Sequence, residues 1–256
     1  MARSAPSGTA VVTGAARGIG RAIAAQPAAQ GFHVVVADVD DDRAADVVDK
    51  IVADGGHASL QHADMNAPAQ IDGMLAAAAE IDGGLAMHAA ARLMKDAGGD
   101  SIVDVASIAG KGWKETSNVA YAAAQGAVVT MTRIAAARFG EYGIRVDSVC
   151  PGMTRTELME GWLQGRSESE GRSVDDLRSE ISRQVPLQRL NQPADVAAAV
   201  GFLGSDAART ITGRSLNVYG GIVWDRGTAE GATRDVGHPD GRVRARRGGR
   251  SAVIVI

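Results

Sequence analysis

Thr13-Gly14-Ala15-Ala16-Arg17-Gly18-Ile19-Gly20 is the stretch of sequence that decides the fold. It overlaps the end of residues 9–13, a short apolar run with the length and composition of a buried strand. A helical stretch then extends from residue 18 to about residue 30. Glycines in a turn between a strand and a helix let backbone N–H groups approach a pyrophosphate, and the helix N-terminus adds a favourable dipole. The stretch therefore predicts a strand–turn–helix unit that binds a dinucleotide.

The acidic end of the second strand-like run, residues 33–37, supports this prediction. The glycine spacing alone is Gly-x-x-x-Gly-x-Gly, not the commoner Gly-x-Gly-x-x-Gly. Asp38 can accept hydrogen bonds from the adenosine ribose hydroxyls and would repel the 2′-phosphate of NADP. NAD is therefore the expected cofactor, although the cation of Arg17 leaves room for NADP. The alternative is that Asp38 only stabilises the N-terminus of the next helix.

Strands and helices alternate along the chain, which predicts a single α/β domain with a doubly wound parallel sheet. The expected strands are residues 9–13, 33–37, 57–62, 101–106, 144–150 and 214–218. The expected helices are residues 18–30, 41–54, 67–81, 85–97, 118–140, 156–164, 173–184 and 193–203. Pro27 removes a backbone donor inside the first helix and should kink it at a cost of about 3 kcal/mol.

One interval breaks the alternation. The helical stretches 67–81 and 85–97 follow each other with no strand between them. Elsewhere each helix returns the chain to a new strand, because parallel neighbours need a crossover connection. The sequence therefore predicts that one strand is missing from this interval.

Composition limits the classes of protein that need consideration. The 256 residues include 45% hydrophobic and 22% charged residues, ordinary values for one globular domain. A net charge of −3 gives no argument for nucleic acid or an anionic membrane as a partner. With Cys150 as the only cysteine and no ligand spacing among the histidines, neither an intramolecular disulfide nor a metal site is expected. Without a secretory signal or a long apolar span, the expected location is the cytoplasm.

Residues 226–256 differ from the rest of the chain. Seven arginines against three acidic residues give this tail a charge of +4, and it ends in Ala-Val-Ile-Val-Ile. Glycines and arginines interrupt any periodic pattern. We therefore expect residues 1–225 to form the dinucleotide-binding domain and residues 226–256 to form a disordered Gly/Arg-rich tail. A basic interaction tail is the alternative.

Further motifs follow in a fixed order, and together they resemble the short-chain dehydrogenase/reductase family over roughly residues 8 to 224. Residues 13–20 are similar to the family's cofactor turn, and Asp64 is similar to its adenine-contacting aspartate. Residues 151–154, Pro-Gly-Met-Thr, resemble the loop that contacts the nicotinamide carboxamide. The resemblance implies NAD(P)-dependent hydride transfer to or from a small alcohol or carbonyl. The cofactor-binding residues expected from the turn and the resemblance are Gly14, Arg17, Gly18, Ile19, Gly20, Asp38, Asp64, Gln125, Pro151, Gly152 and Thr154.

Two more stretches resemble the family's catalytic segments. Residues 105–110, Val-Ala-Ser-Ile-Ala-Gly, resemble the segment that carries the catalytic serine, which makes Ser107 the hydroxyl that orients the substrate oxygen. Residues 121–128 resemble the Tyr-x-x-x-Lys helix, which makes Tyr121 the acid–base residue. Without the resemblance, a buried tyrosine and a strand-end serine are the simpler interpretations.

Gln125 stands where the family has its catalytic lysine. An ammonium one helical turn from a phenol lowers the pKa of the phenol from about 10, and it also holds the nicotinamide ribose. Glutamine can hydrogen-bond the ribose but carries no charge. As the third member of the catalytic set, Gln125 therefore predicts weak activity. Alcohol oxidation should shift toward alkaline pH, and carbonyl reduction should suffer less.

The family also has a fourth strand ending in Asn-Asn-Ala-Gly, which this sequence lacks. That strand is central in the family, so the resemblance predicts a Rossmann-like sheet that lacks one central strand. Either the strand at 101–106 moves beside the first strand, or the nicotinamide site is malformed.

Two hypotheses about function stay open. One is an NAD-dependent alcohol dehydrogenase or carbonyl reductase. Residues 186–189, Pro-Leu-Gln-Arg, are similar to a turn in the family's polyol and diol dehydrogenases, which suggests such a small-molecule substrate. The other is a catalytically silent dinucleotide-binding or subunit-partner protein. Under both hypotheses the resemblance implies a homo-oligomer.

Overall fold

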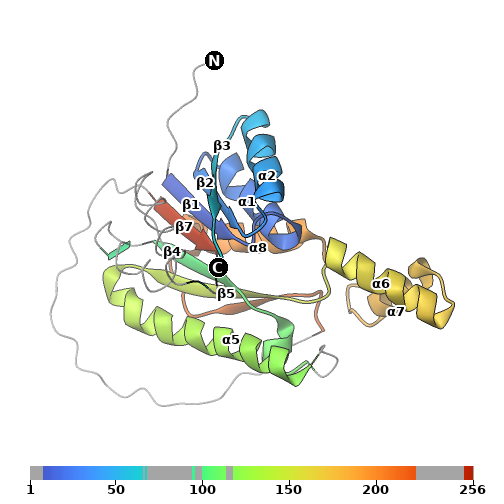
Figure 1. The fold of residues 1–256 in the computed structure, drawn as a ribbon. Coiled ribbons are helices and arrows are strands. Elements are labelled where there is room, and N and C mark those ends of the chain that lie inside the picture. Colours follow the sequence, from blue (N-terminus) through green and yellow to red (C-terminus); the bar gives the residue numbers. More distant parts are fainter. Residues whose placement is uncertain are drawn as a thin grey trace, which may run out of the picture.

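The computed structural model describes residues 8–65, 67, 94–95, 100–113, 118–222 and 251–255 (Figure 1). Within these residues seven strands form one parallel sheet in the order β3-β2-β1-β7-β4-β5-β6. The strands are β1 (Gly8–Thr13), β2 (His33–Asp38), β3 (His57–His62), β4 (Ser101–Val105), β5 (Arg145–Pro151), β6 (Ser215–Val218) and β7 (Ser251–Val255). The six predicted strands are confirmed, each within one residue at either end.

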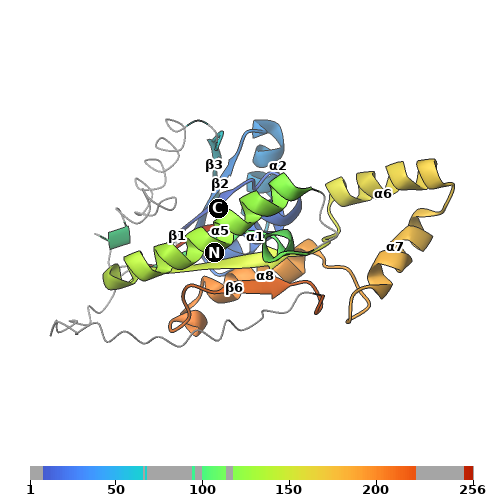
Figure 2. The same cartoon turned by 90° about the horizontal axis from the view of Figure 1, so that it is seen from below.

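Helices cover both faces of the sheet, as the doubly wound prediction requires. They are α1 (Gly18–Ala29), α2 (Asp41–Ala53), α5 (Val119–Phe139), α6 (Glu157–Glu170), α7 (Val174–Arg183) and α8 (Pro193–Leu203). The views in Figures 1 and 2 show α1, α2 and α8 on one face, α5 on the other, and α6 with α7 extending to one side. The predicted helices 67–81 and 85–97 lie outside the described residues, apart from residues 67, 94 and 95. No described helix is long and apolar enough to cross a membrane.

The main core lies between the sheet and the α1, α2 and α8 layer. Its side chains are short and aliphatic, as expected for a chain with few aromatic residues. Each fully buried valine, leucine or isoleucine stabilises the fold by roughly 1.5–3 kcal/mol. Helix α1 continues through Pro27 to Ala29, so the proline lies in its last turn. The missing donor at Pro27 therefore affects only the end of this helix.

The centre of the sheet differs from the sequence prediction. β7 lies between β1 and β4 and is parallel to both, with Ala10 opposite Val253 and Ile102 opposite Ile254. The predictions of a missing central strand and of disorder at residues 251–255 are therefore wrong, and β4 does not move beside β1. The physical reason is that a buried parallel strand needs a continuous apolar run, and Ala-Val-Ile-Val supplies one. The other residues of the predicted tail, 226–250 and 256, lie outside the described residues.

Candidate functional site

The predicted cofactor residues gather at one edge of the sheet. The glycine turn follows β1, Asp38 ends β2, and Asp64 lies two residues beyond β3. On the other side of the sheet centre, Pro151 ends β5 and leads into Gly152. Because all strands are parallel, their carboxyl ends lie at the same edge, where α/β folds bind their ligands.

Backbone geometry explains the three glycines of the turn. Gly14 has φ +61° and Gly18 has φ +56°, a left-handed conformation that favours glycine. A Cβ atom on Gly20 would lie 2.0 Å from the carbonyl oxygen of Gly14, so any larger residue would force the turn apart. The turn therefore depends on glycine at each of the three positions that the sequence analysis singled out.

The N-terminus of α1 lacks a side-chain cap, which favours an anion there. Arg17 precedes the helix in an extended conformation, and the helix has no side-chain cap and no acidic residue in its first turn. The N–H groups of a first helical turn lack partners within the helix, and the helix dipole favours negative charge there. Gly18, Ile19 and Gly20 supply these N–H groups. A Cβ atom on Gly18 would lie 3.5 Å from Cγ2 of Thr156, so the loop after β5 lies against the turn.

Asp38 fixes the geometry of this edge. Its Oδ2 accepts a hydrogen bond of 2.9 Å from the backbone N–H of Ala16, inside the glycine turn. Its Oδ1 accepts from the N–H groups of Val39 and Asp40, and its carbonyl oxygen accepts from Ala63 N–H at 3.0 Å. The sequence predicts a ribose contact or a helix-end role for Asp38, but not this hydrogen bond to the turn. A carboxylate 18 residues after a glycine turn gives no local signal of that bond.

Ser107 lies just beyond β4 and begins a short 3-10 helix, η1 (Ile108–Lys111). Its Oγ accepts a hydrogen bond of 3.2 Å from Ala109 N–H. Gly110 packs on α5 so closely that a Cβ atom there would lie 2.5 Å from the carbonyl carbon of Gln125. This contact seats the serine turn directly on the helix that carries Tyr121.

Tyr121 and Gln125 lie one helical turn apart in α5. Asn118 caps the helix, because its Oδ1 accepts a hydrogen bond of 2.7 Å from Tyr121 N–H. Tyr121 is 41% exposed, so the sequence alternative of a buried tyrosine is wrong. The Oε1 atom of Gln125 is buried and has no hydrogen-bond partner among the described residues. The predicted catalytic set thus combines an accessible phenol with an unsatisfied amide oxygen.

The lysines described in the structure do not replace the missing ammonium. Each makes its contact elsewhere: Lys50 with Asp54, Lys95 over the ring of Tyr142, and Lys111 with the carbonyl oxygen of Ser215. None of these described lysines therefore supplies the charge that the family has at the position of Gln125.

The loop after β5 is fixed by an aromatic side chain. A Cβ atom on Gly152 would lie 1.9 Å from Cγ of Tyr219, so the tyrosine ring lies directly on this glycine. Trp113 meets Tyr219 edge-on, with ring centroids 5.8 Å apart. Thr154 Oγ1 donates to the carbonyl oxygen of Gly152 at 3.0 Å. No local sequence signal indicates this aromatic contact, because Trp113 and Tyr219 are 106 positions apart.

Two buried carboxyl groups lie in the strands below the site. Burial raises the pKa of Asp104 in β4 to about 6, and a hydrogen bond with Thr132 of α5 opposes this shift. Thr132 Oγ1 lies 2.9 Å both from Asp104 Oδ2 and from the carbonyl oxygen of Val128. The Thr132 hydroxyl has one proton. When it donates this proton to the carbonyl oxygen of Val128, a hydrogen bond with Asp104 requires a protonated Asp104 that donates to Thr132 Oγ1. Burial also raises the pKa of Asp147 in β5, against a hydrogen bond from Arg214 N–H.

The described residues fit a nicotinamide dinucleotide. The glycine turn presents backbone N–H groups for a pyrophosphate at a helix end without a side-chain cap, and the buried Oε1 of Gln125 has no partner among the described residues and could accept from a ribose hydroxyl. No group of three His, Cys, Asp or Glu residues suited to a metal ion occurs within the described ranges.

Comparisons with known proteins find relatives along most of the chain. A family model described as short chain dehydrogenase matches residues 8–87, and one described as enoyl-(acyl carrier protein) reductase matches residues 84–223. Meso-2,3-butanediol dehydrogenase of Serratia marcescens is 31% identical over 250 residues, covering 82% of this chain and 92% of the relative. Cyclohexanol dehydrogenase of an Acinetobacter species is 32% identical, covering 82% and 93%. A solved 7α-hydroxysteroid dehydrogenase, complexed with NADH and 7-oxo glycochenodeoxycholic acid, has a TM-score of 0.75 at 26% identity and covers 85% and 94%.

Proposed function

The chain belongs to the short-chain dehydrogenase family, and from this premise we propose that it transfers hydride between NAD and a small secondary alcohol or its ketone. The observation that carries the proposal is the contact between Gly110 and Gln125. It sets the Ser107 turn against the Tyr121 helix, at the edge of the sheet where the glycine turn lies.

The cofactor would lie along this edge of the sheet. The N–H groups of the glycine turn and of Gly18 to Gly20 would hold its pyrophosphate, and Asp38 would accept from the adenosine ribose hydroxyls. Oε1 of Gln125 would accept from the nicotinamide ribose, and residues 151–154 would contact the carboxamide. When bound, the nicotinamide supplies the hydride donor or acceptor. NAD is favoured over NADP because the charge of Asp38 repels a 2′-phosphate.

Tyr121 would exchange the proton of the substrate oxygen. Its side chain is 41% exposed, and its hydroxyl can donate a proton to a carbonyl during reduction and accept one from an alcohol during oxidation. Ser107 would hold the same oxygen by a hydrogen bond. Because Gln125 has no charge, it does not assist ionisation of the phenol. We therefore propose reduced activity at neutral pH, with oxidation affected more than reduction.

The substrate class follows from the relatives and from the surrounding side chains. The named relatives act on a vicinal diol and on a cyclic secondary alcohol. In this chain Trp113 and Met153 are partly buried and pack on the buried Tyr219, and together they form an aromatic wall of which Trp113 and Met153 are the accessible part. A small apolar or diol substrate is the class that this wall would accept. We also propose a homo-oligomer through α5, where Met131 is 44% and Ile134 is 49% exposed.

A second function, dinucleotide binding without turnover, is favoured by one observation. Gln125 keeps a hydrogen-bond acceptor for the ribose but removes the ammonium of the catalytic set. Such a protein would bind NADH like an enzyme and would not convert a substrate.

A titration of the purified full chain with NADH, followed by a panel of vicinal diols and cyclic alcohols with NAD, tests both functions. Saturable binding with turnover supports the dehydrogenase. Saturable binding without turnover on any panel member supports the silent protein and contradicts the dehydrogenase. If neither NADH nor NADPH binds, both functions are wrong.

A further inference from the structure

Strand β7 holds the central position of the sheet although it is last in chain order. Residues 251–255 pair in register with residues 8–12 of β1, and residues 253–255 pair with residues 101–103 of β4. β7 is therefore bonded along both edges. In the described residues, no other strand pairing links β1 to β4.

The sheet divides into two halves at this strand. The half formed by β3, β2 and β1 carries the glycine turn, Asp38 and Asp64. The half formed by β4, β5 and β6 carries Ser107 and residues 151–154. The adenine side and the catalytic side of the proposed site thus lie on different halves, and β7 joins them.

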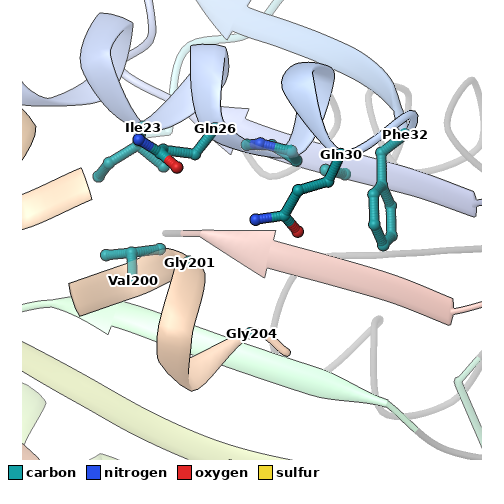
Figure 3. A pocket seen from close by; sticks show the side chains of 9 residues that line it. Ile23, Gln26, Gln30, Phe32, Val200, Gly201 and Gly204 are labelled. Carbon is teal, nitrogen blue, oxygen red and sulfur yellow. The ribbon is translucent and has the colours of Figure 1, made fainter. Parts of the chain in front are cut away.

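An empty slot between β1 and β4 would be costly. Residues 8–12 and 101–103 pair with β7, so without this strand their facing backbone N–H and C=O groups would lose their partners in the sheet. The sequence Ser-Ala-Val-Ile-Val suits the slot because small and β-branched residues favour a strand buried on both faces. Helices α1 and α8 close one face over this region and leave a cavity of only about 20 Å³, lined by Ala10 of β1 among others (Figure 3). That volume holds about one water molecule.

The comparisons indicate that relatives carry residues that this chain lacks. The two family models meet at residues 84–87, inside the interval between β3 and β4. The alignment to the butanediol dehydrogenase spans 250 residues but only 82% of the 256 residues of this chain. It therefore contains positions of the relative that this chain lacks.

Contacts other than strand pairing also join the two halves. Helices α1 and α8 pack together, and Ser101 Oγ of β4 donates to the carbonyl oxygen of Leu203 in α8 at 3.2 Å. The halves therefore stay associated through α8 if β7 leaves. The 32 residues between Val218 and Ser251 separate β7 from β6, and closing such a long connection costs entropy.

We propose that the slot between β1 and β4 is a strand-acceptor surface whose occupant is residues 251–255 of the same chain, and that docking of this strand couples the two halves of the dinucleotide site. The coupling rests on the proposed function, whereas the docking does not. Coupling is reciprocal, so a bound dinucleotide stabilises docked β7, and a displaced β7 weakens dinucleotide binding.

Hydrogen exchange of the full-length chain, followed by mass spectrometry, tests the docking. Amides of residues 251–255 should exchange slowly, and NADH should slow them further, by about tenfold. Exchange at the rate of an unstructured peptide overturns the docking. If NADH binds but leaves exchange of residues 251–255 unchanged, the coupling is wrong. If NADH does not bind, the proposed function fails while the docking is still tested.

A proline substitution tests the coupling from the other side. Val253→Pro removes a ladder hydrogen bond from a strand paired on both edges, whereas Val243→Pro makes the same change in the connecting segment. The first should speed exchange in residues 8–12 and 101–103 and weaken NADH binding about tenfold, and the second should do neither. Equal effects of the two variants overturn the coupling. If Val253→Pro does not fold, the NADH-dependent exchange of the unmodified chain decides.

Crosslinking identifies the occupant of the slot. Ala10 and Val253 are opposite each other, so the double variant Ala10→Cys/Val253→Cys should form a disulfide within one chain on mild oxidation. The single variants serve as controls for the buried Cys150. A monomer band with altered mobility on a denaturing, non-reducing gel supports the proposal. A crosslinked dimer shows that residues 251–255 of a second copy fill the slot. The absence of any crosslink shows that this segment of neither copy fills it. Either result overturns the proposal.

Discussion

Gly110 lies so close to Gln125 that a Cβ atom on the glycine would be 2.5 Å from the carbonyl carbon of the glutamine. The atoms on the α5 side belong to the helix backbone, which cannot move aside as a flexible side chain can. η1, which begins after Ser107, and α5, which carries Tyr121, are therefore fixed to each other at this point.

Gly110→Ala should separate these two elements. A displacement of about 1 Å in a catalytic group can lower turnover by about 10²-fold, so we expect a loss of that order with cofactor binding largely kept. Gly126→Ala is the matched control, because its Cβ would lie 3.4 Å from the carbonyl oxygen of Gly110, an ordinary contact. Steady-state kinetics of both variants measure the effect. Equal turnover in the two variants would mean that the contact does not position the site.

Gln125→Lys should restore the missing charge. An ammonium one turn from Tyr121 favours the ionised phenol, so turnover in alcohol oxidation should rise about tenfold at neutral pH, with a smaller gain in reduction. Gln164→Lys makes the same change on exposed α6, where Gln164 bonds to Glu168. Rates measured across pH should show the gain only for Gln125→Lys. No gain at neutral pH would contradict the role assigned to Gln125.

Asp38→Asn should relax the choice between NAD and NADP. The amide keeps an oxygen that can accept from Ala16 N–H, but it removes the charge that repels a 2′-phosphate. The ratio of NADH to NADPH affinity should fall about tenfold, as measured by fluorescence titration with both cofactors. Asp54→Asn is the control, since Asp54 lies at the far end of α2 with Lys50. The cofactor preference is wrongly assigned to Asp38 if both variants keep the same ratio.

Asp104→Asn should change how stability depends on pH. In the folded chain the pKa of Asp104 is raised from 3.8 to about 6, so unfolding releases a proton between these values. The folded state therefore loses stability as pH rises through this window, by roughly 3 kcal/mol at about 1.4 kcal/mol for each pKa unit. The amide can donate to Thr132 and does not ionise.

Denaturant unfolding of the Asp104→Asn variant at about pH 4 and about pH 7 measures this difference. The variant should gain stability relative to the parent chain at the higher pH and little at the lower. Asp147 has a pKa raised by burial as well, so its contribution stays in both proteins and cancels in the comparison. An equal change at both pH values would show that Asp104 does not ionise in this range.

Much of the fold could be predicted from the sequence, because its signals are local. The apolar run 33–37 bounded by Asp38, and Pro193 at the start of α8, identify their elements without reference to the rest of the chain. The place of residues 251–255 could not be predicted in this way. Their apolar sequence is compatible with a strand, but nothing near them specifies pairing with β1 and β4, more than 140 residues away.

The candidate site shows the same limit. The family motif identified Ser107, Tyr121 and Gln125, and the structure brings the segments that carry them together. The close approach of Gly110 and the aromatic wall of Trp113 and Tyr219 depend on how segments pack, which residue spacing does not report. The N-cap role of Asn118 could be predicted from the sequence, since asparagine before an apolar helical run is a common N-cap.

Hydride transfer with Tyr121 as the acid–base residue is tested by the initial rate of NADH formation from NAD and a vicinal diol, compared between the unmodified chain and Tyr121→Phe. Tyr142→Phe is the control, because Tyr142 lies at the other end of α5 beneath Lys95. We predict a measurable rate in the unmodified chain and in the control, and a loss of about 10²-fold or more in Tyr121→Phe with NADH binding kept. The same rate in Tyr121→Phe as in the unmodified chain would contradict this prediction.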